Sequence, residues 1–158
     1  MEELRIQYQS LDSWKQLPDD EKKLVEKAYE ASAKAYAPYS GFNVGACLLL
    51  EDGTIVLGNN QENAAFPSGT CAERTALFYA GANFPDKAIK TLVVVAKGDF
   101  VDFESTLSPC GGCRQVMLES EKRQTTPIKV ILVSQNERTI SLNSVGDLLP
   151  FAFSSSKK

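Results

Sequence analysis

The sequence contains no histidine among its 158 residues. Histidine is a common general base near neutral pH and a frequent metal ligand, so a zinc site in this chain must depend on cysteine. Any general acid or base must also come from another residue type. The four cysteines and the carboxylates are therefore the candidate metal ligands and proton carriers.

Basic runs and long apolar runs are also missing. No basic run is longer than a pair such as the terminal Lys157–Lys158, and the net charge is −3. A surface that tracks phosphates needs clustered Lys and Arg, so we expect no nucleic-acid partner. The first residues lack the apolar core of a signal peptide, and no stretch is long enough for a membrane span. We therefore expect a cytoplasmic protein without a membrane partner, whose cysteines serve metal binding or catalysis rather than disulfides.

The pattern of apolar residues predicts alternating strands and helices. Leu4, Ile6 and Tyr8 alternate with polar residues, which indicates a short strand with one buried face. The expected helices are one that Pro18 opens and Pro38 ends, 71–80, 110–121 and a last turn over 144–149. The expected strands span 44–50, 54–58, 92–96, 128–134 and 138–142. This order predicts the α/β class, with one central sheet and helices packed on it.

Two short clusters hold the groups most suited to catalysis. They are Cys71-Ala72-Glu73 and Pro109-Cys110-Gly111-Gly112-Cys113. A catalytic zinc typically takes three protein ligands and leaves one position for water, which makes Cys71, Cys110 and Cys113 the candidate ligands. Glu73 follows Cys71 by two residues, where its carboxylate can move the protons of that water.

Both clusters lie at expected helix starts, whose free N–H groups stabilise thiolates. Three thiolates and one Zn²⁺ sum to a charge of −1. We therefore expect Arg74 and Arg114 to offset this charge and to hold the sulfurs by hydrogen bonds. Cys47 lies in the apolar run 45–50 and is expected to be a buried core thiol.

Each cluster has a simpler interpretation when it is taken alone. Cys110 and Cys113 suit a redox dithiol or half of a structural zinc knuckle. Glu73 fits a capping box with Thr70 at a helix start, and spacing alone favours that cap. The adjacent Cys71 and the second cluster reverse this preference and favour catalytic zinc.

The sequence resembles cytidine deaminases over residues 36–153. Zinc deaminases share a Cys-x-Glu or His-x-Glu segment and a Pro-Cys-x-x-Cys segment. The segments that carry the resemblance occur in the family's order: Phe42–Ala46, Gly58–Ala64, Cys71–Ala76, Ser108–Gln115 and Leu148–Pro150. The similarity is to the small homotetrameric type with three cysteine ligands and one Zn²⁺ per subunit.

The resemblance implies a three-layer α/β/α fold, with a mixed five-stranded sheet and helices on both faces. We expect residues 1–17 to form a strand-like extension, 18–153 the catalytic domain and 154–158 a flexible tail. The implied reaction is the hydrolytic deamination of cytidine and 2′-deoxycytidine to uridine and 2′-deoxyuridine, a step of pyrimidine salvage. Glu73 would carry protons between the attacking water, N3 of the base and the departing amine.

The resemblance also assigns substrate contacts. Asn60 and Glu62 would bind the ribose hydroxyls, Phe42 would flank the pyrimidine and the backbone of Ala72 would contact the base. Phe153 would reach the pocket of a neighbouring subunit, in a homotetramer with shared active sites. Phe151 competes with Phe153 for this role, and both rings could instead bury the C-terminal segment.

Three other functions compete with this one. A blasticidin-type aminonucleoside deaminase shares both zinc clusters, although the 60–63 segment and the 148–150 segment favour cytidine. A non-enzymatic zinc module would need Cys47 as a fourth ligand. A thiol redox protein would bind no metal and would oxidise Cys110 with Cys113.

Overall fold

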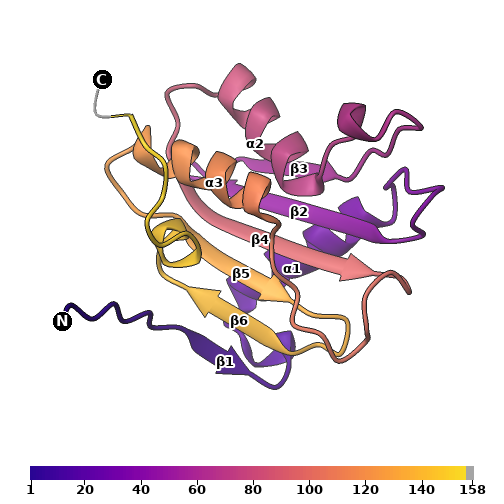
Figure 1. Ribbon diagram of the computed structural model, residues 1–158, viewed down its shortest axis with the longest axis horizontal. Helices are drawn as coiled ribbons and strands as arrows, with labels where there is room; N and C mark the ends of the chain where they lie inside the picture. The colour runs from indigo at the N-terminus through magenta and orange to yellow at the C-terminus, as the bar shows by residue number, and fades with distance from the viewer. Residues whose placement is uncertain (156–158) are drawn as a thin grey trace.

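A six-stranded sheet forms the middle layer of the protein (Figure 1). The computed structural model describes residues 1–155. The elements in chain order are β1 (Gln9–Leu11), η1 (Trp14–Gln16), α1 (Asp19–Ser32), β2 (Asn43–Leu50), β3 (Ile55–Asn59), η2 (Phe66–Ser68), α2 (Ala72–Asn83), β4 (Ile89–Lys97), α3 (Gly111–Lys122), β5 (Lys129–Val133), β6 (Thr139–Leu142) and η3 (Val145–Leu148). Across the described residues, no helix has the length and apolarity that a membrane span requires.

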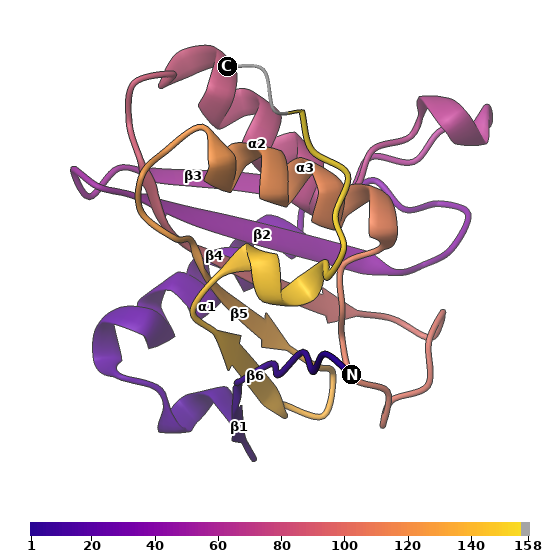
Figure 2. The ribbon, with the colours of Figure 1, turned by 60° about the vertical axis from the view of Figure 1, so that its left-hand side comes forward.

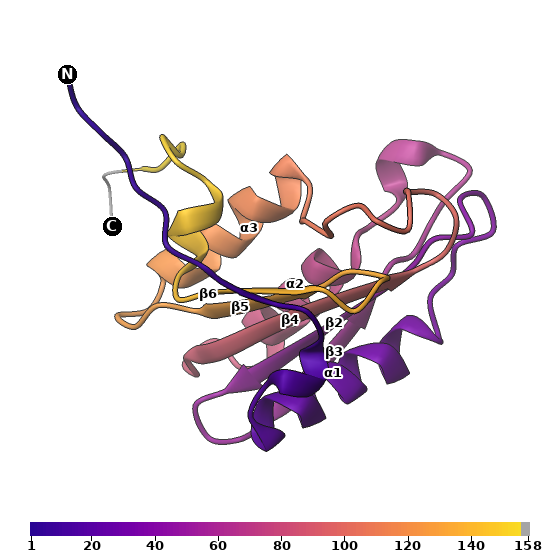
Figure 3. The same cartoon turned by 90° about the horizontal axis from the view of Figure 1, so that it is seen from below.

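The strand order across the sheet is β1-β6-β5-β4-β2-β3. β4 and β5 are parallel and the other neighbouring pairs are antiparallel, so the sheet is mixed. The helix α1 covers one face, while α2, α3 and η3 lie on the other (Figures 2 and 3). The predicted three-layer α/β/α class is confirmed. The sheet has six strands rather than five because β1 adds an edge strand beside β6.

The two faces of the sheet carry separate apolar cores. The core under α1 includes Leu24, Val25, Ala28, Cys47, Val93, Val95, Ile131 and Val133. The core under α2 and α3 is larger and includes Ala46, Leu48, Leu92, Val94, Ala72, Ala76, Met117 and Leu132. Strands that are buried on both faces consist of nearly continuous apolar runs, and β2, β4 and β5 follow this rule.

A glycine in β3 sets how closely α2 approaches the sheet. A Cβ at Gly58 would collide with the carbonyl oxygen of Ala72 and would lie 2.6 Å from the amide nitrogen of Ala76. Only glycine leaves this space, so the first turn of α2 packs directly on the strand backbone. This contact fixes the position of Cys71, which directly precedes α2.

The N-terminal segment differs from the prediction. The strand is Gln9–Leu11 rather than the stretch around Leu4 and Ile6, and it pairs within the chain through Gln9 opposite Ser141. The side chains of Leu4, Ile6 and Tyr8 are exposed, so the predicted buried face is wrong. Alternation alone favoured a half-buried strand there, but these side chains have no core to cover.

Helix boundaries also differ in three places. α1 ends at Ser32, well before Pro38, because the backbone of Tyr36 bonds to the segment that begins at Asn60. α2 continues beyond the expected end at residue 80, through Gly81 to Asn83. α3 runs from Gly111 to Lys122, one residue later than expected at each end, and Cys110 is its N-cap.

Candidate metal and active site

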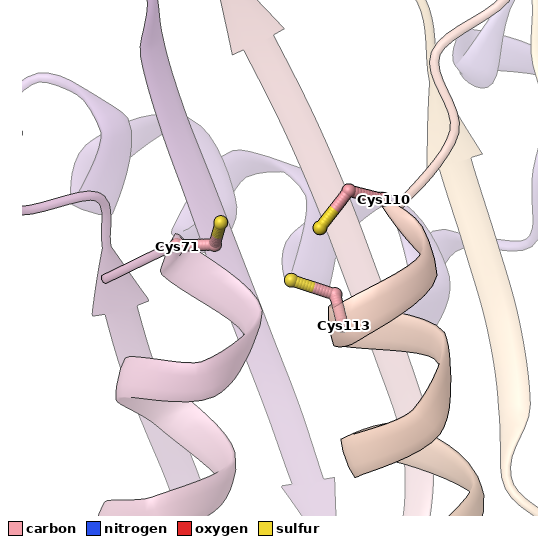
Figure 4. A group of neighbouring side chains, drawn as sticks. All are labelled: Cys71, Cys110 and Cys113. Carbon is pink, nitrogen blue, oxygen red and sulfur yellow. The ribbon is translucent and has the colours of Figure 1, made fainter. Parts of the chain in front are cut away.

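Three thiols meet between the first turns of α2 and α3. Cys71 is the N-cap of α2, Cys110 is the N-cap of α3 and Cys113 lies in the first turn of α3. Their three sulfur atoms lie within 4.8 Å of one another, and Figure 4 shows the side chains pointing toward a common centre. The structure therefore joins the two cysteine clusters that the sequence separates by almost forty residues.

The geometry and chemistry of this cluster fit zinc. Tetrahedral zinc with Zn–S bonds of about 2.3 Å places its sulfur ligands about 3.8 Å apart, which is within the spread of these sulfurs. Thiolates are soft ligands that select zinc over magnesium or calcium. Three ligands leave a fourth tetrahedral position for water, which is the arrangement of catalytic rather than structural zinc sites.

The electrostatic surroundings favour a thiolate at Cys71. A hydrogen bond from Cys113, and the adjacent Arg74 guanidinium, lower the pKa of Cys71 to about 5. The same hydrogen bond raises the pKa of Cys113, which acts as the donor. Nη2 of Arg74 lies 3.6 Å from Sγ of Cys71. Arg74 therefore contributes a positive charge next to the thiols, where the sequence predicted it.

Arg114 has a different set of partners from the predicted one. Its guanidinium donates to the carbonyl oxygen of Pro109 at 2.9 Å, to that of Leu148 at 2.9 Å and to Oγ of Ser108 at 2.6 Å. None of these partners is a sulfur. Arg114 instead ties the loop before Cys110 to η3, so it supports the cluster through the backbone.

Glu73 lies in the first turn of α2 beside the thiols, and only 5% of its surface is exposed. Burial raises the pKa of the Glu73 carboxyl above its ordinary value, and the negative charge of Cys71 adds to this effect. The capping box with Thr70 does not form, because Cys71 is the N-cap and no side chain caps the helix. Helix capping therefore does not explain why a carboxylate is buried here.

The loop after β3 is held against the start of β2 by polar side chains. Oδ1 of Asn60 accepts a hydrogen bond from the Val44 amide and Nδ2 donates to the Phe42 carbonyl, each at 2.8 Å. The Glu62 carboxylate accepts bonds from the Tyr39 amide at 2.9 Å and from the Ser40 hydroxyl. The hydrogen bond from the Ser40 hydroxyl contributes most to lowering the pKa of Glu62 below its ordinary value. The Glu62 carboxylate therefore stays charged.

Ser40 is a further polar residue of this loop contact, and no motif in the sequence indicates its role. Its hydroxyl donates to Glu62 and accepts a hydrogen bond from the Phe42 amide at 3.0 Å. The Pro38-Tyr39-Ser40-Gly41 segment has the composition of a turn, and this was the available signal. The fold was needed to place that turn beside Glu62.

The remaining predicted contacts lie in different settings. Ala72 is fully buried at the start of α2, and Phe42 is half-buried immediately before β2. The rings of Phe151 and Phe153 are 98% and 84% exposed, so they do not bury the C-terminal segment within the chain. The backbone of Phe153 is nevertheless held, because its carbonyl oxygen accepts a hydrogen bond from Gln115 at 3.1 Å.

Cys47 is excluded as a fourth ligand by its position. It is fully buried in the core between the sheet and α1, on the opposite face from α2 and α3. Burial raises its pKa to about 12, so it remains a protonated thiol. The predicted core role of Cys47 agrees with this location, and a closed site with four thiolates is not available among these side chains.

An α/β/α fold that holds three thiols at two helix starts, with a buried carboxylate beside them, is typical of the zinc-dependent deaminases. The family model of the cytidine and deoxycytidylate deaminase zinc-binding region matches residues 18–138. The chain belongs to the cytidine deaminase family, and its cofactor is Zn²⁺.

Individual relatives agree with this assignment. The chain is 44% identical over 135 residues to a cytidine deaminase of Sporosarcina psychrophila, a match that covers 85% of this chain and 92% of the relative. The crystal structure of the cytidine deaminase from Burkholderia pseudomallei is 41% identical with a TM-score of 0.70, and it covers 84% of this chain and 98% of that one. The structure of the Mycobacterium tuberculosis enzyme is 32% identical with a TM-score of 0.66, over 87% of this chain and 100% of that chain.

Proposed function

We propose that this protein catalyses the zinc-dependent hydrolytic deamination of cytidine and 2′-deoxycytidine, with release of ammonia. The observation that carries the proposal is the buried Glu73 carboxyl beside a thiol cluster with room for a fourth ligand. The direct test is the formation of equal amounts of uridine and ammonia from cytidine by the zinc-containing protein. The clustering of three cysteines as metal ligands rather than in disulfides favours a cytoplasmic setting.

Cys71, Cys110 and Cys113 are the proposed zinc ligands, and Arg74 offsets the excess negative charge of three thiolates. When bound, zinc supplies Lewis-acid chemistry that lowers the pKa of water in the open ligand position. The buried surroundings strengthen the interaction of Glu73 with any charge or proton donor placed next to it, because the local dielectric is low.

Glu73 moves protons in the proposed reaction. Its carboxylate takes a proton from the attacking water and delivers one to N3 of the cytosine ring while the water oxygen adds to C4. Glu73 then transfers the second water proton to the amino group, which leaves as ammonia. The products are uridine and ammonia, so one water and one nucleoside are consumed in each cycle. A single carboxylate serves both transfers because the positions to be protonated lie on one side of the ring.

Asn60 and Glu62 are the proposed ribose contacts, and Phe42 and the Ala72 backbone are the proposed base contacts. Asn60 bonds to the backbone on both sides of Asn43, so the sugar-binding and base-binding residues are held in one unit. Ribose hydroxyls can donate hydrogen bonds, and the charged carboxylate of Glu62 can accept them.

Glu62→Gln is expected to raise the KM for cytidine about 10- to 100-fold, because a neutral amide replaces the charged acceptor of the ribose hydroxyls. Free cytosine lacks the sugar and serves as the control substrate. The measurement is the ratio of kcat/KM for cytidine to that for cytosine in the parent and the variant. Equal losses on both substrates would remove Glu62 from the ribose role.

The active site is proposed to be shared between subunits of a homotetramer. The exposure of Phe153 supports this, because its backbone is fixed to α3 while its side chain lies outside both apolar cores of the described residues. Base–aromatic stacking contributes roughly 1–3 kcal/mol in single-stranded nucleic-acid sites, and we expect a similar effect here. Phe153→Ala should therefore raise the KM for cytidine.

Mixed oligomers test whether Phe153 acts across the interface. Chains with Glu73→Ala keep an intact Phe153, and chains with Phe153→Ala keep an intact Glu73. Co-assembly should restore complete sites and raise the rate at low cytidine above the sum of the separate variants. Native mass spectrometry must show that mixed oligomers form. If they form and the rate does not rise, Phe153 does not act in trans, and Phe151 is the next candidate.

A further inference from the structure

The loop 98–107 connects β4 to α3 and so leads from the sheet to the thiol cluster (Figure 1). Three apolar side chains on it are exposed, namely Phe100, Val101 and Phe103. Loops are usually polar at such positions because exposed apolar side chains gain no burial energy. The composition of this loop therefore requires an explanation that the zinc chemistry does not supply.

One of these side chains touches a residue of the proposed substrate pocket. The ring of Phe100 packs on the ring of Phe42, with centroids 5.9 Å apart and an angle of 44° between the planes. Tilted aromatic pairs at this distance are attractive. Phe42 is half-buried whereas Phe100 is 69% exposed, so Phe100 is the more solvent-accessible residue of the pair.

The backbone of the loop is fastened close to Phe42. Gly98 has φ +137°, and a Cβ there would collide with the Gly41 carbonyl and lie 2.9 Å from Cα of Phe42. The amide of Gly98 donates to Oε1 of Gln135 at 2.9 Å, and Nε2 of Gln135 donates to the Val101 carbonyl at 3.3 Å. These contacts brace the backbone on both sides of Phe100 and keep it next to Phe42.

We propose that Phe100 is a positioning residue for the base: it holds the Phe42 ring in the orientation that flanks the pyrimidine. The inference rests on the proposed function, because it takes Phe42 as the residue beside the base. Asn60 holds the Phe42 backbone at 2.8 Å, and Phe100 holds its ring. Phe42 is thus fixed from two sides by separate loops before the substrate binds, which limits the ordering that binding requires.

Phe100→Ala is the test, with Phe100→Tyr as the conservative variant. Loss of an aromatic pair corresponds to about a 3- to 10-fold change in binding. We expect the KM for cytidine to rise by this factor, with kcat within about twofold of the parent. The rise should be the same for 2′-deoxycytidine, because both substrates share the base. Phe100→Tyr keeps an aromatic ring at this position, so its KM should equal that of the parent.

Phe103→Ala is the matched control, because Phe103 lies in the same loop and has no ring contact with Phe42 among the described residues. It should leave KM unchanged. An unchanged KM in Phe100→Ala, or an equal rise in Phe103→Ala, would overturn the inference. Loss of zinc or of thermal stability in Phe100→Ala, with kcat falling and KM constant, would also overturn it. A parent protein that forms no uridine would instead overturn the proposed function, and this inference with it.

Discussion

Replacing Glu73 by Gln should lower kcat for cytidine deamination about 10²- to 10⁴-fold, the usual contribution of a general acid–base group. Gln keeps the size and shape of the side chain but cannot carry a proton between water and base. Glu73 lies beside the thiols but is not one of the three proposed zinc ligands, so zinc content should remain at one per chain. The measurement combines single-turnover kinetics with metal analysis of the same sample.

Two outcomes would contradict the role assigned to Glu73. Near-parental turnover by Glu73→Gln would show that another group transfers the protons. Loss of zinc with a folded chain would show that the carboxylate binds the metal. Glu73→Ala should repeat the kinetic result and also leave a small cavity, so its thermal stability should be compared with that of the Gln variant.

The second large effect concerns the thiols. Changing Cys71, Cys110 or Cys113 to Ala should each remove most of the zinc and abolish turnover, because two thiols are left to hold the metal. Zinc binding also contributes to folding free energy when the ligands are distant in sequence, so each variant should unfold at a lower temperature. Metal analysis and thermal unfolding of the three variants check both expectations.

Cys47→Ala is the matched control for these variants. Its thiol lies in the α1 core, across the sheet from the cluster, and should not affect metal content. The cost should be limited to about 1 kcal/mol of stability for a small cavity. An empty zinc site in Cys47→Ala would mean that Cys47 is a ligand, and it would favour the closed structural site.

Much of the fold was predictable from local patterns. The runs that form β2, β4 and β5 are apolar on both faces, and the glycine of the 52–53 turn has φ +88°, as a hairpin turn often requires. The N-terminal strand was misplaced because alternation around Leu4 does not reveal whether a core lies beneath it. The end of α1 was misplaced because Tyr36 pairs with a segment more than twenty residues away.

The site was predictable where its chemistry is local. The three cysteines and Glu73 lie in two short clusters at helix starts, and their types alone indicate zinc. The partners of Arg114 and the support from Ser40 were not predictable, because they depend on contacts between distant segments. The role of Phe100 was not predictable for the same reason, because its contact with Phe42 joins two loops nearly sixty residues apart.

We propose that the zinc held by the three thiols and the carboxylate of Glu73 together deaminate cytidine. The most direct measurement removes zinc with a chelator, restores it in steps and follows uridine and ammonia formation at each step. We expect the rate to rise in proportion to bound zinc, to level at one zinc per chain, and to yield uridine and ammonia in equal amounts. Full turnover without zinc, or no uridine at one zinc per chain, would contradict the account.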